Sequence, residues 1–180
     1  MRTSGKKLFM VISVTLFFLF LVLFGSREGL SAKKTCYDCH TDAKAKHAKT
    51  FVHSPVAKED CEACHKRHGF SNKLILKAEG SELCYTCHKE LKEKFKKKTV
   101  HPPVQKGQCT ACHNPHASNV KGLIKEKDDR TSVCFDCHKE LNGILSAAGI
   151  HQPFRNGECI ICHPAHSSDQ DRLLTRTGDE

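Results

Sequence analysis

The stretch CYDCH at residues 36–40 holds two cysteines and a histidine within five positions, and its spacing, Cys-x-x-Cys-His, returns five more times along the 180-residue chain. All 12 cysteines belong to these six motifs, and the 13 histidines supply one to each motif. The motifs begin at Cys36, Cys61, Cys84, Cys109, Cys134 and Cys159. Because no cysteine is left over, the whole motif, rather than the single thiol, is the unit that carries function.

Cys-x-x-Cys-His is the attachment signature of c-type haem. Two thiols three positions apart lie along one face of a helical turn, where each can form a thioether with a haem vinyl group, and the adjacent imidazole can bind the iron. The sequence therefore predicts six covalently bound haem c groups. The predicted thioether residues are Cys36, Cys39, Cys61, Cys64, Cys84, Cys87, Cys109, Cys112, Cys134, Cys137, Cys159 and Cys162. The predicted proximal iron ligands are His40, His65, His88, His113, His138 and His163.

Two other uses of the cysteines fit the pattern less well. Pairs of Cys-x-x-Cys can share a zinc ion, and the cysteines of an exported chain can close into disulfides. Zinc held by four thiolates gives the six motif histidines no role, and disulfides between cysteines three positions apart close loops too short to constrain the unfolded chain. Haem is therefore the preferred interpretation.

The six motifs form three units of two motifs, each about 50 residues long, because the odd-numbered motifs resemble one another. A histidine stands in the middle of each unit, in HSPV, HPPV and HQPF at residues 53–56, 101–104 and 151–154. Another histidine closes each unit, three positions after the histidine of the second motif. We expect three tandem dihaem modules at residues 33–83, 84–133 and 134–180.

These features resemble the doubled Cys-x-x-Cys-His multihaem cytochromes c over essentially all of residues 34–176. The resemblance rests on the Cys-aromatic-x-Cys-His start, the His-x-Pro-Val centre and the Cys-His-Asn-Pro-His end at residues 112–116. The first unit departs from it with Lys66 and Arg67 in place of Asn-Pro, and the third with Pro164 and Ala165. The resemblance implies a small extracytoplasmic electron carrier, or a partner of membrane and periplasmic oxidoreductases, with mostly two histidine ligands for each haem.

Six histidines outside the motifs recur in register and are the candidate distal iron ligands: His53, His68, His101, His116, His151 and His166. We expect the middle histidines to serve the first haem of their own unit, and the closing histidines to serve the second haem of a unit or of a neighbouring unit. His47 has no histidine counterpart, because Phe95 and Leu145 stand at its position, so we expect it to be an ordinary surface imidazole. Methionine ligation is not expected in a cleaved protein, since the only methionines are Met1 and Met10.

The expected fold class is mostly α-helical and irregular, with little or no β structure, packed around covalent haems. Helix-forming composition follows the first motif of a unit at residues 88–98 and 138–148, and the prolines beside the middle histidines are expected to end these helices. Short apolar clusters at residues 74–76, 123–124 and 173–174 are expected to cover haem faces. The last cluster could instead dock on the first unit of another molecule, which leaves self-association open.

Residues 1–32 are expected to be a signal peptide, because positive charges precede an uncharged run at residues 8–24 and small residues end at Ala32. An uncleaved anchor of the inner membrane formed by residues 8–24 is the alternative, since such a run is at the lower limit for crossing a bilayer. In both cases the rest of the chain lies in the periplasm or is otherwise extracytoplasmic. Membrane contact is expected only if the segment is uncleaved.

The formal charge of +9 does not point to nucleic acid, because the chain has no nucleic-acid-binding motif and only 7% aromatic residues. Irons with two histidine ligands leave no position for a substrate, so we expect an electron carrier without catalytic residues, and histidine ligation favours a low reduction potential. The expected partners are redox proteins as donor and acceptor, including a membrane quinol-oxidising complex. The alternatives are a multihaem reductase with one open iron and a conductive filament.

Overall fold

The computed structural model describes residues 34–67, 75–127 and 133–176. The described residues from Thr35 onward belong to one compact unit. The signal peptide or anchor expected at residues 1–32 lies outside the described residues. Within the described residues, no helix is both long and apolar enough to cross a membrane.

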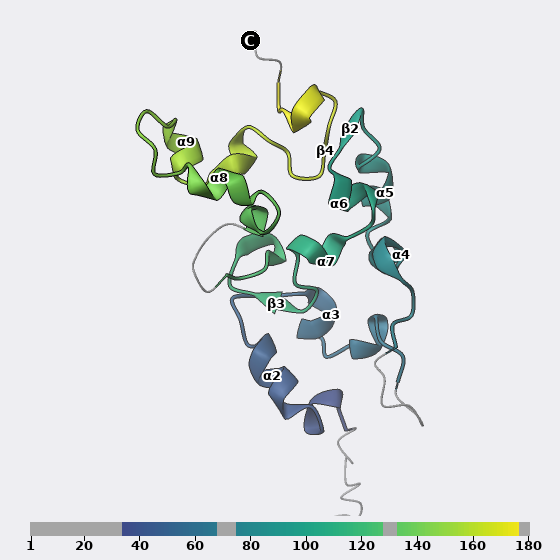
Figure 1. Cartoon of the computed structure of the whole chain (residues 1–180). Coiled ribbons are helices and arrows are strands. Elements are labelled where there is room, and N and C mark those ends of the chain that lie inside the picture. The colour runs from purple at the N-terminus through teal and green to yellow at the C-terminus, as the bar shows by residue number, and fades with distance from the viewer. Residues whose placement is uncertain (1–33, 68–74, 128–132, 177–180) are drawn as a thin grey trace, which may run out of the picture. The chain divides into compact units, whose positions relative to one another are not determined.

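Short helices joined by loops make up the described chain (Figure 1). The α-helices are α2 (Thr41–His47), α3 (Ser54–Ala57), α4 (Gly80–Tyr85), α5 (Lys89–Lys94), α6 (Pro102–Gln105), α7 (Cys109–Cys112), α8 (Lys139–Gly143) and α9 (Gln152–Arg155). The 3-10 helices are η1 (Cys36–Asp38), η2 (Cys61–Ala63), η3 (Lys121–Leu123), η4 (Val133–Asp136), η5 (Cys159–Ile161) and η6 (Asp171–Leu173). The strands are β1 (Phe51–Val52), β2 (Thr99–Val100), β3 (Ala117–Ser118) and β4 (Ser167–Ser168). This composition confirms the predicted fold class.

Each Cys-x-x-Cys-His motif closes one helical turn. In all six motifs the backbone N–H of the histidine donates to the carbonyl of the first cysteine, at N···O distances of 2.9–3.0 Å. In the first motif of each module the histidine is also the N-cap of the next helix, α2, α5 or α8. One turn therefore presents two thiols and an imidazole, as haem attachment requires.

The middle histidines begin helices. His53, His101 and His151 are the N-caps of α3, α6 and α9, and each of these helices has proline in its first two positions. Proline suits this position because the first N–H groups of a helix have no intrahelical partner. The prediction that the prolines end the preceding helices is therefore wrong: α5 already ends at Lys94 and α8 at Gly143, and the prolines start the next helices.

Two short antiparallel ladders connect successive modules. Strand β1 of the first module pairs with β3 of the second, with Phe51 opposite Ser118, and β2 of the second module pairs with β4 of the third. Each ladder continues to the histidines, because the N–H of His53 donates to the carbonyl of His116 at 2.9 Å and His101 makes the same bond to His166. The ladders therefore place a middle histidine beside the closing histidine of the next module.

Ion pairs accompany both ladders. The Nζ atom of Lys49 lies 2.8 Å from Glu126, and that of Lys97 lies 2.6 Å from Asp169. Exposed pairs of this kind contribute little individually. Both pairs nevertheless join a lysine of one module to a carboxylate of the next module.

The described residues form almost no apolar core. Their only buried hydrophobic side chains are those of Tyr37, Ala117 and Phe135, whereas Ile160 is 70% exposed. Side chains alone do not fill an interior here. That covalent groups complete the packing stays a prediction.

Candidate haem-binding site

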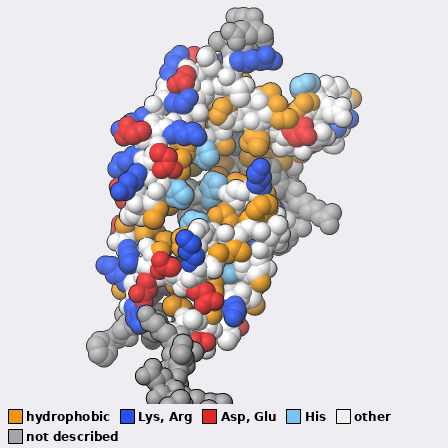
Figure 2. All heavy atoms as spheres, turned by 180° about the vertical axis from the view of Figure 1, so that it is seen from behind, with side chains coloured by type: hydrophobic (Ala, Val, Ile, Leu, Met, Phe, Trp, Pro, Cys, Tyr) orange, Lys and Arg blue, Asp and Glu red, His pale blue; other side chains and the backbone are white. Residues whose placement is uncertain are grey.

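Imidazole rings from distant parts of the chain face one another in four nearly parallel pairs. The pairs are His53 with His88 (centroids 6.1 Å apart, planes at 14°), His65 with His116 (6.0 Å, 12°), His101 with His138 (6.3 Å, 13°) and His113 with His166 (5.9 Å, 9°). Every pair joins one motif histidine to one of the repeated histidines outside the motifs. Figure 2 shows histidine side chains gathered among hydrophobic side chains on one face of the molecule.

The spacing of these pairs fits a metal held between two imidazoles. Metal–nitrogen bonds of about 2.0 Å, with each ring centroid about 1.1 Å behind its nitrogen, separate two centroids by about 6.2 Å. The four observed separations span 5.9–6.3 Å. In the described residues, no group of three or more His, Cys, Asp or Glu side chains could hold a metal ion. A pair of axial ligands suits haem, because the porphyrin brings the other four nitrogens.

The pairs cross from one module to the next. The middle histidine His53 faces His88, in the first motif of the following module, so the expected pairing with its own module's first motif is wrong; His101 behaves in the same way. The closing histidine His116 faces His65, in the second motif of the preceding module. We expected a closing histidine to serve the second haem either of its own module or of a neighbouring module. The structure places it opposite the second motif of the neighbouring module.

Hydrogen bonds orient several of the rings. The Nδ1 atoms of His53, His101, His113 and His163 lie 2.9, 3.1, 2.8 and 3.2 Å from the carbonyl oxygens of Pro115, Ala165, Gly122 and Arg172. A ring nitrogen against a carbonyl oxygen carries the proton, which leaves Nε2 with the lone pair that a metal ligand needs. These four rings thus have the tautomer that suits iron.

The imidazoles of His116 and His166 are held differently, by aromatic stacking. His47 stacks on His116 with centroids 4.7 Å apart and planes at 21°, and Phe95 stacks on His166 at 4.7 Å and 20°. Burial lowers the pKa of both closing histidines, and nearby imidazoles lower it further. The expectation that His47 is an ordinary surface imidazole is wrong, since its ring is half-buried in this stack.

The thiols of consecutive motifs lie close enough to affect one another. Burial raises the pKa of several thiols, and that of Cys84 reaches about 11. A thiol of an adjacent motif raises the pKa further: Cys36 acts on Cys61, Cys87 on Cys64, Cys109 on Cys84, and Cys134 on both Cys112 and Cys159. No disulfide joins any of the 12 motif cysteines, all of which lie within the described residues. The thiols of each motif therefore lie near those of the next motif along the whole series of six.

The remaining candidates have other surroundings. His68 lies outside the described residues. His151 is exposed and lines a cavity of about 260 Å³ together with His163, Cys159 and Cys162. No ring pair joins His151 to another imidazole in the described part of the chain. The motif histidine His40 is exposed.

The apolar clusters between motifs fold back onto the second motif of their module. The backbone N–H of Lys66 donates to Ile75, and that of Lys125 donates to Cys112. Leu76, at 42% exposed, has little protein cover. That these clusters cover haem faces stays a prediction, with residue 74 outside the described residues.

Comparison with known families finds one match. The family of the doubled CXXCH motif matches residues 53–93, 101–143 and 151–180, which is more than half of the chain. A comparison with curated proteins finds no match. Each matched segment begins at a middle histidine, and the first two segments enclose the pairs of His53 with His88 and of His101 with His138. The boundaries of the matched repeat thus keep each of these two histidine pairs within one segment.

Proposed function

Because the chain belongs to the doubled CXXCH motif family and is a multihaem c-type cytochrome, we propose that it carries six haem c groups and passes electrons between redox partner proteins outside the cytoplasm. The 12 motif cysteines form the thioethers in this proposal. The six motif histidines are the proximal ligands. When bound, haem supplies one-electron exchange between ferric and ferrous iron.

The four facing imidazole pairs carry the proposal. They support two histidine ligands for the haems of the second to fifth motifs, with His116, His53, His166 and His101 as the distal ligands in that order. An iron with two imidazoles has no open position, so electron transfer is favoured over chemistry on a substrate. His68 and His151 remain the distal candidates for the first and last haems.

The contacts between consecutive motifs support a continuous path. The thiols of neighbouring motifs influence one another at all five steps from the first motif to the sixth. Porphyrins held by these cysteines would approach closely, since the thiols of neighbouring motifs are already near one another. The chain then acts as a relay, in which the protein sets spacing, ligation and electrostatics.

The partners of this relay are proposed to be a redox donor and a redox acceptor, with a membrane quinol-oxidising complex as one candidate. The proposed location is the periplasm or another extracytoplasmic compartment. Anchoring by residues 8–24 is the alternative to cleavage of the leader. Intact mass of the membrane and soluble fractions distinguishes these forms.

A second candidate function is reduction of a small molecule at an open iron. It is favoured by the cavity of about 260 Å³ that His163 and His151 line, since no parallel ring pair joins His163 to another imidazole among the described residues. An exposed iron next to such a cavity would bind small ligands. Carbon monoxide, which binds open ferrous haem, distinguishes the two functions.

The deciding experiment uses the full chain matured in a host that makes c-type cytochromes. Haem is quantified per chain, and the visible spectrum is recorded after dithionite and again after carbon monoxide. Six haems without an immediate shift of the Soret band on mixing with carbon monoxide support the carrier, because an iron with two histidine ligands binds the gas only as slowly as a histidine leaves. A shift in about one sixth of the haem, absent from a Cys159→Ala, Cys162→Ala variant, would favour the reductase. Absence of c-type bands would overturn both the carrier and the reductase function. Zinc binding would then be the preferred interpretation of the cysteines.

A further inference from the structure

The distal imidazoles are oriented in two distinct ways. The rings of His53 and His101 are fixed by hydrogen bonds from Nδ1 to backbone carbonyls. No hydrogen bond to a ring nitrogen of His116 or His166 is present within the described residues, and each of these rings instead lies against an aromatic ring. The closing histidines therefore need another element to set their orientation.

That element occupies the same place in two modules. His47 and Phe95 both stand seven positions after the first motif histidine, at the C-terminal ends of α2 and α5. Their stacks have the same centroid separation, 4.7 Å, and interplanar angles of 21° and 20°. The geometry thus repeats although one residue is polar and the other apolar.

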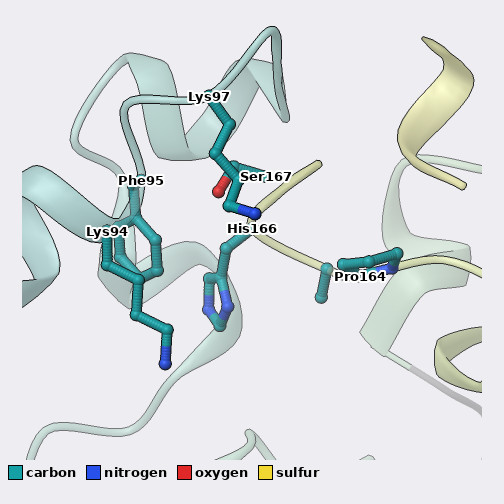
Figure 3. A pocket seen from close by; sticks show the side chains of 7 residues that line it. Lys94, Phe95, Lys97, Pro164, His166 and Ser167 are labelled. Atoms are coloured by element: carbon teal, nitrogen blue, oxygen red, sulfur yellow. The ribbon is translucent and has the colours of Figure 1, made fainter. Parts of the chain in front are cut away.

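The two aromatic rings have different surroundings besides the stacked imidazoles. The hydroxyl of Tyr37, a buried side chain of the first motif, lies 2.8 Å from Nδ1 of His47. Phe95 lines a cavity of about 280 Å³ together with Lys94 and His166, and Figure 3 shows its ring beside the imidazole. Both aromatic side chains are half-buried and are therefore not free surface side chains.

We propose that His47 and Phe95 are positioning residues, which hold the imidazoles of His116 and His166 in the orientation that binds the second haem of the preceding module. This inference rests on the proposed function, because it requires haem at the second and fourth motifs. A coordinated imidazole can still rotate about its bond to the metal, and a ring stacked on its face opposes both rotation and departure. The contact also links the helix that follows one haem to the distal ligand of the next haem.

The test compares variants at Phe95, which stacks without a hydrogen bond. Reduced holoprotein is mixed with carbon monoxide, which can bind the fourth haem only after His166 leaves. Phe95→Leu is expected to speed this step about 2- to 12-fold, which corresponds to the 0.5–1.5 kcal/mol of an aromatic pair at 1.4 kcal/mol per factor of ten. Phe95→His, which copies the first module, is expected to keep the wild-type rate.

A second readout reports orientation directly. In the ferric protein, electron paramagnetic resonance distinguishes parallel from crossed imidazole planes, and the pair of His113 with His166 is nearly parallel at 9°. Phe95→Leu is expected to broaden or shift the signal of one haem, and Phe95→His to retain it. His47→Leu and His47→Phe repeat the comparison at the second haem. Leu145→Ala is the matched control, because Leu145 holds the equivalent position in the third module and has no aromatic ring.

The outcomes separate the two levels of the argument. Six bound haems with identical rates and spectra in the Phe95→Leu and His47→Leu variants would overturn the positioning role while leaving the electron carrier intact. Equal acceleration by the leucine and the aromatic replacements would also overturn it, because ring stacking would then be irrelevant. A wild-type protein without bound haem would instead overturn the proposed function.

Discussion

Removal of His116 should open an iron in the preceding module and not in its own. The ring of His116 faces His65, with centroids 6.0 Å apart, whereas the motif histidine of its own module, His113, faces His166. His116→Ala should therefore leave the haem of the second motif with one protein ligand. Because the chain has six motifs, about one sixth of the total haem should then bind carbon monoxide after reduction.

Double variants identify the haem that opens. Removing the second haem, by Cys61→Ala with Cys64→Ala, should abolish the carbon monoxide signal of His116→Ala. Removing the fourth haem, by Cys109→Ala with Cys112→Ala, should leave that signal unchanged. The assay is the amplitude of the Soret shift relative to haem content. If instead removal of the fourth haem abolishes the signal, the reasoning that ligands cross between modules is refuted.

Two further predictions concern the protein framework and are measured by equilibrium unfolding of the holoprotein. Gly107 and Gly157 occupy equivalent positions with φ of +68° and +71°, but a Cβ at Gly107 would lie 2.7 Å from Oγ of Ser81, whereas Gly157 faces open space. Gly157→Ala should thus cost about 1–2 kcal/mol for the left-handed backbone, and Gly107→Ala should cost more; equal losses would contradict the predicted clash. A hydrogen bond from Lys49 lowers the pKa of the Glu126 carboxyl from its usual 4.5, so its stabilising contribution is present above pH 4.5 and is lost as pH falls through the lowered value. The stability difference between wild type and Glu126→Gln should accordingly shrink on acidification, and a constant difference would argue against this linkage.

The sequence was sufficient for the parts of the site that are local. Each motif turn depends on five consecutive residues, so the shared geometry of the thiols and the motif histidine follows from spacing alone. The register of the repeat also identified His53, His101, His116 and His166 as ligand candidates, and the structure places each of them opposite a motif histidine. Local spacing and internal repetition are visible without tertiary structure.

Local spacing and repetition could not predict which motif histidine each distal candidate faces. This pairing depends on ladders of two residues per strand, which are too short to produce an alternating pattern; Phe51 and Val52 pair with a polar and a small residue of another module. The stack of His47 on His116 was missed for a related reason. Comparison of equivalent positions shows Phe95 and Leu145 in place of His47, and the aromatic residue of the second module was the signal for a packing role.

Ligands that cross between modules change what the repeating unit is. A module cut at residue 84 separates His53 from His88, whereas the matched segment at residues 53–93 keeps this pair together. If each porphyrin is bound by thioethers of one module and an imidazole of another, then haem loading joins modules that the two-residue ladders alone would hold weakly. Stability would then reside in the contacts between neighbours, as in other repeat proteins. The same crossing would hold successive haems at a fixed spacing, so one structural device would provide both cohesion and the path for electrons.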